Sequence, residues 1–210
     1  MKQRLTRRDA LERCAAMGLL VAGPGLTLSR VALAFEDAEK NKFKPTPRNE
    51  VGPFYKKHAP LTTQMRSRGD AGMPLSVSGR VFDTRGDQLQ DAEIEVWHTD
   101  HFGHYDLAGY RFRAQFHPSA GAYALETVMP GHYPDRVCQH VHYMVRAPGH
   151  KALVTQLYFA TDPVFEGDPD KNYVKDPILL SRELIRPVRL LTDGDSPTAQ
   201  VTFDLCLERA

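Results

Sequence analysis

Cysteine, tryptophan and long apolar runs are scarce in this sequence of 210 residues, and its charges almost cancel. Three cysteines are too few for the disulfide framework of a small secreted domain. The 27 basic and 26 acidic side chains form no Lys/Arg stripe, so no nucleic-acid partner is expected. The apolar stretch from Cys14 to Leu28 is interrupted by Gly and Pro and falls short of the ~20 residues that span a bilayer. No stable membrane anchor is therefore predicted.

A pair of arginines precedes that apolar stretch. The order Thr6-Arg7-Arg8-Asp9-Ala10-Leu11, apolar run, then Val31-Ala32-Leu33-Ala34 is typical of a twin-arginine export signal. We expect residues 1–34 to be removed after Ala34 and the protein to be periplasmic or extracellular. The signal holds six basic and two acidic side chains, so the rest of the chain has a net charge near −3. The twin-arginine route carries folded proteins, which favours a cofactor loaded before export.

Two cysteines, Cys138 and Cys206, lie beyond the signal and would reach an oxidising compartment, where disulfides persist. Their separation in the sequence says nothing about their distance in space. A bridge between them and two free thiols therefore both remain open.

Short runs of alternating polarity fill the chain after residue 74. Leu75–Asp83 and Ala92–Trp97 alternate with a period of two and flank the turn signal Arg85-Gly86-Asp87. The further strand candidates are Tyr110–Phe116, Tyr123–Val128, Val141–Val145, Thr155–Phe159 and Ala199–Leu207. Pro177–Ile185 is the one modest helical stretch after the signal. We expect an all-β fold, a β-sandwich with few short helices over residues 75–210, after an N-terminal arm and lead-in segment over residues 35–74.

Two histidines stand two residues apart in a β-favouring run. In a strand, the side chains of His140 and His142 point to the same face, where they can close on one metal ion. Two half-exposed histidines on a sheet surface are the alternative. Cys138 has the same strand parity, so a thiolate ligand is conceivable, ranked below the tyrosines.

Two tyrosines are candidates to complete the ligand set. Tyr105 lies two residues after Gly103 in a loop rich in histidine and aromatics, and Tyr133 follows a Pro-Gly turn. A phenol has a pKa of about 10, so it ionises at neutral pH only beside a cation. Two phenolates with two neutral imidazoles make a hard, anionic set that suits Fe(III). Tyr110 is the rival to Tyr105.

Five segments in order carry a resemblance to a known family. They are Gly52-Pro53-Phe54-Tyr55, Glu95-Val96-Trp97-His98 with Gly103-His104-Tyr105, Pro130-Gly131-His132-Tyr133-Pro134, His140-Val141-His142-Tyr143 and Thr155-Gln156-Leu157-Tyr158-Phe159. Together they resemble the intradiol ring-cleavage dioxygenases, the family of catechol 1,2-dioxygenase and protocatechuate 3,4-dioxygenase. The resemblance implies an oxidoreductase of aromatic compound catabolism. Such an enzyme cleaves a catechol-type ring between its two hydroxylated carbons, placing both atoms of O2 in a cis,cis-muconate-type product.

The same resemblance implies roles for individual residues. One non-haem Fe(III) per chain would be held by Tyr105, Tyr133, His140 and His142. A bound catechol would displace Tyr133, which then takes a substrate proton as a catalytic base. Gln156, in an intact Thr-Gln-Leu-Tyr-Phe context, is a second catalytic candidate, and an ordinary strand glutamine is its alternative.

The family's arginine, three residues before the first histidine, is replaced here by Val137, and Arg136 lies one place earlier. A shift of one residue reverses the face in a strand, but in a loop it need not. Arg136 is therefore a candidate, not an assigned residue, for stabilising charge on the activated ring. Only six residues separate Tyr133 from His140, which predicts a more open pocket.

The altered arginine keeps a second hypothesis open: an exported β-sandwich module that binds a metal or ligand without dioxygenase activity. A cupin-like site is disfavoured because Tyr143–Pro148 offers no glutamate. Protocatechuate, catechol, hydroxyquinol and larger catechols all remain open as substrates. A homo-oligomer is compatible with the sequence.

Overall fold

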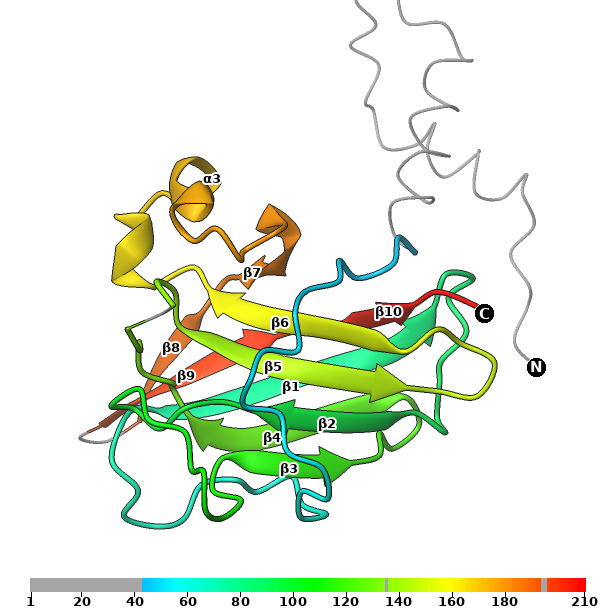
Figure 1. Cartoon of the computed structure of the whole chain (residues 1–210), viewed down its shortest axis with the longest axis horizontal. Coiled ribbons are helices and arrows are strands. Elements are labelled where there is room, and N and C mark those ends of the chain that lie inside the picture. Colours follow the sequence, from blue (N-terminus) through cyan, green and yellow to red (C-terminus); the bar gives the residue numbers. More distant parts are fainter. Residues whose placement is uncertain (1–42, 135, 194–195) are drawn as a thin grey trace, which may run out of the picture. The chain divides into compact units, whose positions relative to one another are not determined.

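The computed structural model describes residues 43–134, 136–193 and 196–210, which form two β-sheets with a few short helices (Figure 1). The predicted signal, residues 1–34, and the first part of the predicted arm lie outside these residues. Within them, no helix has the length and apolar character needed to cross a membrane.

The first sheet carries the predicted histidine pair on a central strand. Its order is β3 (Arg113–Phe116), β2 (Glu93–Trp97), β5 (His140–Arg146), β6 (Leu153–Phe159) and β7 (Ile185–Arg186). Neighbouring strands are antiparallel, except that β7 runs parallel to β6.

The second sheet is built on the long strand β1 (Pro74–Asp83). β4 (Ala122–Val128) pairs with it in antiparallel fashion, while β9 (Ser196–Thr202) and β10 (Leu205–Leu207) pair with it in parallel. β8 (Arg189–Asp193) lies beside β9. The short helices all fall between β6 and β7: η1 (Pro163–Phe165), α3 (Pro169–Asn172), η2 (Tyr173–Lys175) and η3 (Arg182–Leu184).

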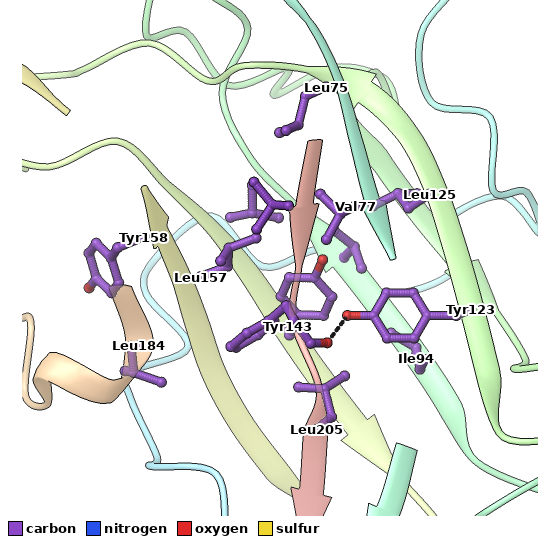
Figure 2. Packing of buried hydrophobic residues seen from close by; sticks show 14 of the residues in the cluster. Leu75, Val77, Ile94, Tyr123, Leu125, Tyr143, Leu157, Tyr158, Leu184 and Leu205 are labelled. Carbon is purple, nitrogen blue, oxygen red and sulfur yellow. Dashed lines mark hydrogen bonds between the residues drawn. The ribbon is translucent and has the colours of Figure 1, made fainter. Parts of the chain in front are cut away.

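The hydrophobic core fills the space between the two sheets (Figure 2). From the first sheet, Tyr143 and Leu157 point into it, and from the second Leu75 and Val77 do so, all fully buried. This follows from the period-two alternation of strands, which assigns alternate residues to the core. The opposite face of the first sheet is therefore left for His140, His142 and their in-register neighbours.

The expected mostly-β fold with few short helices is confirmed, but two predicted elements are wrong. The predicted strand Ala199–Leu207 divides into β9 and β10, because the Asp204 carboxylate between them accepts a hydrogen bond from Arg80 N at 2.8 Å. The predicted helix Pro177–Ile185 is reduced to η3. The helical turn that forms, α3, begins earlier, where Asp168 caps it by accepting from Lys171 N and proline occupies its start.

Residues 43–64, called the strap below, cross the outer face of the first sheet (Figure 1). Asn49 N donates to Val154 O at 2.8 Å, and Thr155 Oγ1 donates to Pro47 O at 2.7 Å. Further along, Thr62 N donates to Gln115 O at 3.0 Å, so the strap is fastened from β6 to β3. It thereby covers the row of side chains on which the candidate site is built.

Asp83, at the end of β1, anchors a turn by accepting several hydrogen bonds. It is fully buried, and it accepts from Arg85 N at 2.9 Å, Asp87 N at 3.0 Å and Arg209 Nε at 2.7 Å. Burial by itself would raise the pKa of Asp83, but these hydrogen bonds outweigh it and lower the pKa to about 2. The ionised carboxylate therefore contributes stability above the ordinary carboxyl pKa, and that contribution is lost as the pH falls toward 2.

We predict that Asp83→Asn lowers the free energy of unfolding at neutral pH by about 2 kcal/mol, since buried donors lose a charged acceptor. The difference in free energy of unfolding between the variant and the wild type should stay constant above pH 4 and shrink between pH 4 and pH 2. Chemical denaturation at a series of pH values measures it, with Asp87→Asn, on an exposed side chain, as control. A difference that is as large at pH 2 as at pH 7 would contradict this account.

Candidate metal centre

One rung of the first sheet aligns four side chains under the strap. Trp97 on β2 is directly opposite Arg113 on β3 and His142 on β5, and His142 is opposite Gln156 on β6. Residues opposite each other in antiparallel strands share a face, so all four point away from the core. All four are buried, because the strap and the loops after β2 and β4 cover them.

The rings of Tyr105, Tyr133, His140 and His142 form a closed circuit. The centroids are 4.9 Å apart for His140 and His142, and 6.5 Å apart for His142 and Tyr105. They are 5.6 Å apart both for Tyr105 and Tyr133 and for Tyr133 and His140. The structure thus gathers all four predicted ligands around a common point.

The two tyrosines meet because their loops are tied together. The Asp100 carboxylate accepts from Phe102 N and His104 N, both at 2.9 Å, and Asp100 O accepts from Gly131 N at 2.8 Å. Gly103 has a φ of 87°, and a Cβ there would lie 1.8 Å from His132 O. Only glycine allows this approach of the loop after β2 to the loop after β4.

Tyr110, the rival of Tyr105, faces elsewhere. Its hydroxyl donates to Lys57 O at 3.0 Å, and Lys56 Nζ lies 4.4 Å from its ring centroid. Tyr110 therefore packs on the strap, outside the circuit of rings.

Both imidazoles of the circuit have a lowered pKa, which favours the neutral form. His140 Nδ1 lies 2.8 Å from Cys138 O, which fixes the tautomer that leaves Nε2 unprotonated. Burial, reinforced by the charge of Arg136, lowers the pKa of His140 to about 3, and burial likewise lowers the pKa of His142. The Trp97 ring stacks on the His142 ring, with ring centroids 4.9 Å apart and ring planes 4° apart. This stacking holds the orientation of the imidazole. Neutral, oriented imidazoles are what a metal ligand set requires.

The phenols need a cation to ionise. Burial, and then the neighbouring Tyr133, raise the pKa of Tyr105, and burial raises the pKa of Tyr133 although Arg136 opposes it. Within the described residues, Tyr105 Oη and His142 Nδ1 are buried and make no hydrogen bond of full geometric quality, although Tyr133 and the backbone of Glu50 lie beside them. Buried polar atoms are rarely left unpaired, so these atoms fit a site that a metal completes.

The donor set favours a hard metal. No group of three or more His, Cys, Asp and Glu side chains is placed to hold a metal in residues 43–134, 136–193 and 196–210. The phenol oxygens of Tyr105 and Tyr133 are further donors at this point, and such hard donors suit Fe(III). Cys138 is an unlikely ligand on chemical grounds, since burial raises the pKa of its thiol and keeps it protonated. Cys138 and Cys206 are both free thiols.

Arg136 reaches the circuit even though it is displaced by one residue from the family's position. It is 6% exposed, whereas Val137, at the family's position, is 42% exposed. Arg136 Nη2 donates to Gln156 Oε1 at 2.9 Å and to Tyr158 Oη at 2.7 Å, and Nη1 lies 3.3 Å from His140 Nε2. Because Arg136 lies in a loop, the shift does not turn it away from the site.

Two partners of Arg136 were not anticipated from the sequence. Asp176, from the segment between β6 and β7, is buried and lies 3.5 Å from Arg136 Nη2. Tyr158 Oη accepts from Arg136 and donates to Gln156 Oε1 at 2.7 Å. Tyr158 shares the strand parity of Gln156, which is a usable signal, whereas nothing local indicates Asp176. Gln156 Nε2 also donates to Glu50 O of the strap at 2.8 Å, so both ends of this amide are fixed.

The two remaining histidines next to the ligand segments fasten loops. His98 Nε2 lies 2.7 Å from Thr127 Oγ1, which ties the end of β2 to β4. His132 Nε2 lies 3.0 Å from Asp162 Oδ1, which ties the Tyr133 loop to the segment after β6. Each contact orients a segment that carries a candidate ligand.

Comparisons with known proteins identify relatives of this chain. A hydroxyquinol 1,2-dioxygenase of Nocardioides simplex is 33% identical over 190 residues, covering 76% of this chain and 63% of that protein. A catechol 1,2-dioxygenase of Acinetobacter baylyi is 28% identical over 204 residues, and the match covers 83% of this chain and 66% of that enzyme. The chain therefore spans slightly less than two thirds of the length of these two enzymes.

A solved structure also resembles this chain closely. It is the dioxygenase domain of a dioxygenase and carbohydrate-binding protein fusion from the cellulolytic bacterium Streptomyces sp. SirexAA-E. It has 33% identity and a TM-score of 0.67, and the match covers 80% of this chain and 100% of that one. The sequence model of the dioxygenase family, described as "Dioxygenase", matches residues 51–209. With the family's five segments gathered around one circuit of rings, the chain belongs to the intradiol ring-cleavage dioxygenases.

Proposed function

We propose that this protein is a non-haem Fe(III) dioxygenase that cleaves a catechol-type ring between its two hydroxylated carbons. O2 is the second substrate, and the product is a cis,cis-muconate-type dicarboxylic acid. The observation that carries the proposal is the closed circuit of Tyr105, Tyr133, His140 and His142. Both named relatives act on small dihydroxylated or trihydroxylated benzenes, as their names state, which supports a catechol-type substrate.

The four residues of the circuit would hold one ferric ion per chain. When bound, this ion acts as a Lewis acid that makes the catechol more acidic and its ring reactive toward O2. Both tyrosines of the circuit are partly exposed, and the family resemblance assigns displacement by the substrate to Tyr133. Its Oη would then accept a proton from a catechol hydroxyl.

Arg136 and Gln156 would act on the substrate from one side. The Arg136 guanidinium supplies positive charge beside the ring that becomes electron-rich, in a site from which the strap excludes water. Gln156 is held by Glu50 O at one end and by Arg136 and Tyr158 at the other. This fixed hydrogen-bond network orients the guanidinium before substrate binds.

We predict that the purified ferric protein absorbs visible light and consumes O2 with at least one member of a catechol panel.

Tyr133→Phe should weaken that visible absorption and lower turnover about 100-fold, because the base is lost. His140→Ala should lose iron, as measured by metal analysis. Tyr110→Phe is the matched control and should leave colour and rate unchanged. Normal iron content and rate in both site variants would refute the ligand assignment.

Arg136→Lys tests the displaced arginine. Lysine keeps the charge beside Asp176 but cannot bridge Gln156 and Tyr158 together, so kcat should fall about 100-fold while iron content stays normal. The double variant Arg136→Val/Val137→Arg moves the guanidinium to the family's position, whose side chain faces outward here. We expect it to be as slow as Arg136→Lys or slower. Wild-type kcat in either variant, from steady-state O2 uptake, would remove Arg136 from the mechanism.

We further propose that the protein is exported by the twin-arginine route, on the basis of Thr6–Leu11 and the small residues ending at Ala34. Replacing Arg7 and Arg8 by lysine should retain the uncleaved precursor in the cytoplasm of an expressing bacterium. Cell fractionation and the mass of the exported protein measure this, with a mature form beginning at Phe35 expected from the wild type. Export of the double variant at the wild-type level would argue for another route.

A further inference from the structure

Arg113 is a buried arginine that forms no close ion pair among the described residues. It is 3% exposed, and no ion pair in the part of the chain that the structure describes includes it. Arg136, the other buried arginine, has Asp176 beside it. A buried cation without a counter-ion is costly, so its retention at the rung of Trp97, His142 and Gln156 calls for a physical reason.

The hydrogen bonds of Arg113 join the two segments that enclose Tyr105. Nη1 donates to Phe54 O of the strap at 2.6 Å, and Nη2 donates to Asp106 O at 3.4 Å in the residue after Tyr105. Phe54 in turn stacks on Tyr105, with centroids 4.3 Å apart and planes 20° apart. Arg113 therefore fixes the ring of Tyr105 from both sides, through its own loop and through the strap.

The charge of Arg113 also faces Tyr105. Its guanidinium carbon lies 5.6 Å from the ring centroid, and its Nε is buried without a hydrogen-bond partner among the described residues. Two carbonyl oxygens satisfy part of the guanidinium but bring no negative charge. The Asp106 carboxylate contributes some negative charge nearby, and a phenolate at Tyr105, as in the metal-bound state, would add an anion next to the guanidinium.

We infer that Arg113 is a positioning residue of the metal centre, which clamps Tyr105 between its loop and the strap and provides the buried positive charge that faces a metal-bound Tyr105 phenolate. The inference rests on the proposed ferric function. It adds to that function a residue on β3 that touches neither metal nor substrate. A merely structural Arg113 would fasten the loop without affecting the electrons of the phenolate.

The test compares Arg113→Met, Arg113→Lys and the control Arg111→Met in the ferric full-length protein. Methionine keeps much of the apolar stem and removes the charge, while lysine keeps the charge and loses the planar fork. Arg111 lies two residues away, is 53% exposed and pairs with Asp70, so its replacement removes the same charge outside the clamp. Far-UV circular dichroism and thermal unfolding establish that each variant is folded.

The readouts are the visible absorption of the ferric protein and iron retention against a competing chelator. Without the facing charge, the phenolate electrons lie higher in energy, so the absorption of Arg113→Met should move to longer wavelength. Its iron affinity should fall about tenfold or more, as for other residues that orient metal ligands. Arg113→Lys should keep the wild-type wavelength with a smaller loss of affinity, and Arg111→Met should match the wild type in both.

Each other outcome has a defined meaning. A folded Arg113→Met with unchanged wavelength and iron affinity overturns the inference while leaving the proposed function intact. If Arg113→Met does not fold, Arg113→Gln, which removes the charge but keeps a polar side chain, takes its place: a longer wavelength supports the charge role, and the wild-type wavelength overturns it. A wild-type protein that takes up no ferric iron overturns the proposed function and this inference with it.

Discussion

Removal from water determines the pKa values of the imidazole and phenol groups at this centre. The sheet, the strap and two loops take the imidazoles and phenols largely out of water, which lowers the pKa of His140, raises the pKa of Tyr105 and favours the uncharged form of each. Neutral imidazoles are ready to bind, whereas neutral phenols must give up protons to do so. The same burial that favours the histidines as ligands therefore makes the tyrosines depend on a strongly charged metal, which is a physical basis for selecting a trivalent ion over a divalent one.

The precision of the centre comes from strand register rather than from the ligands. The rung of Arg113, Trp97, His142 and Gln156 is set by antiparallel pairing, so a slip of one residue would turn His142 into the core. The two tyrosines have no such register and depend on the contacts of Asp100 with Gly131 and of Gly103 with His132. Strands thus carry the two imidazoles of the circuit, and tied loops carry the two phenols.

Much of this arrangement was predictable from the sequence because it follows local rules. Strand parity placed His140 and His142 on one face, and the glycine before Tyr105 marked a tight loop. Parity could not show that Trp97 stacks on His142, because this partner lies 45 residues away in the sequence on another strand. Asp176 and Arg113 depend on tertiary proximity in the same way. The predicted helix at Pro177–Ile185 is wrong because the chain there turns back toward Asp176, whose carboxylate accepts from Ile178 N.

The strap has a consequence for the order of assembly. It pairs with the first sheet at scattered points, through Asn49, Thr155 and Gln115, and its partners are strands made later in the sequence. These contacts span long stretches of chain, so the strap docks only once β3, β2, β5 and β6 have formed, and forming such distant contacts is slow. The wall beside His142 consequently depends on contacts between distant parts of the chain, so its formation carries a large loop-closure cost.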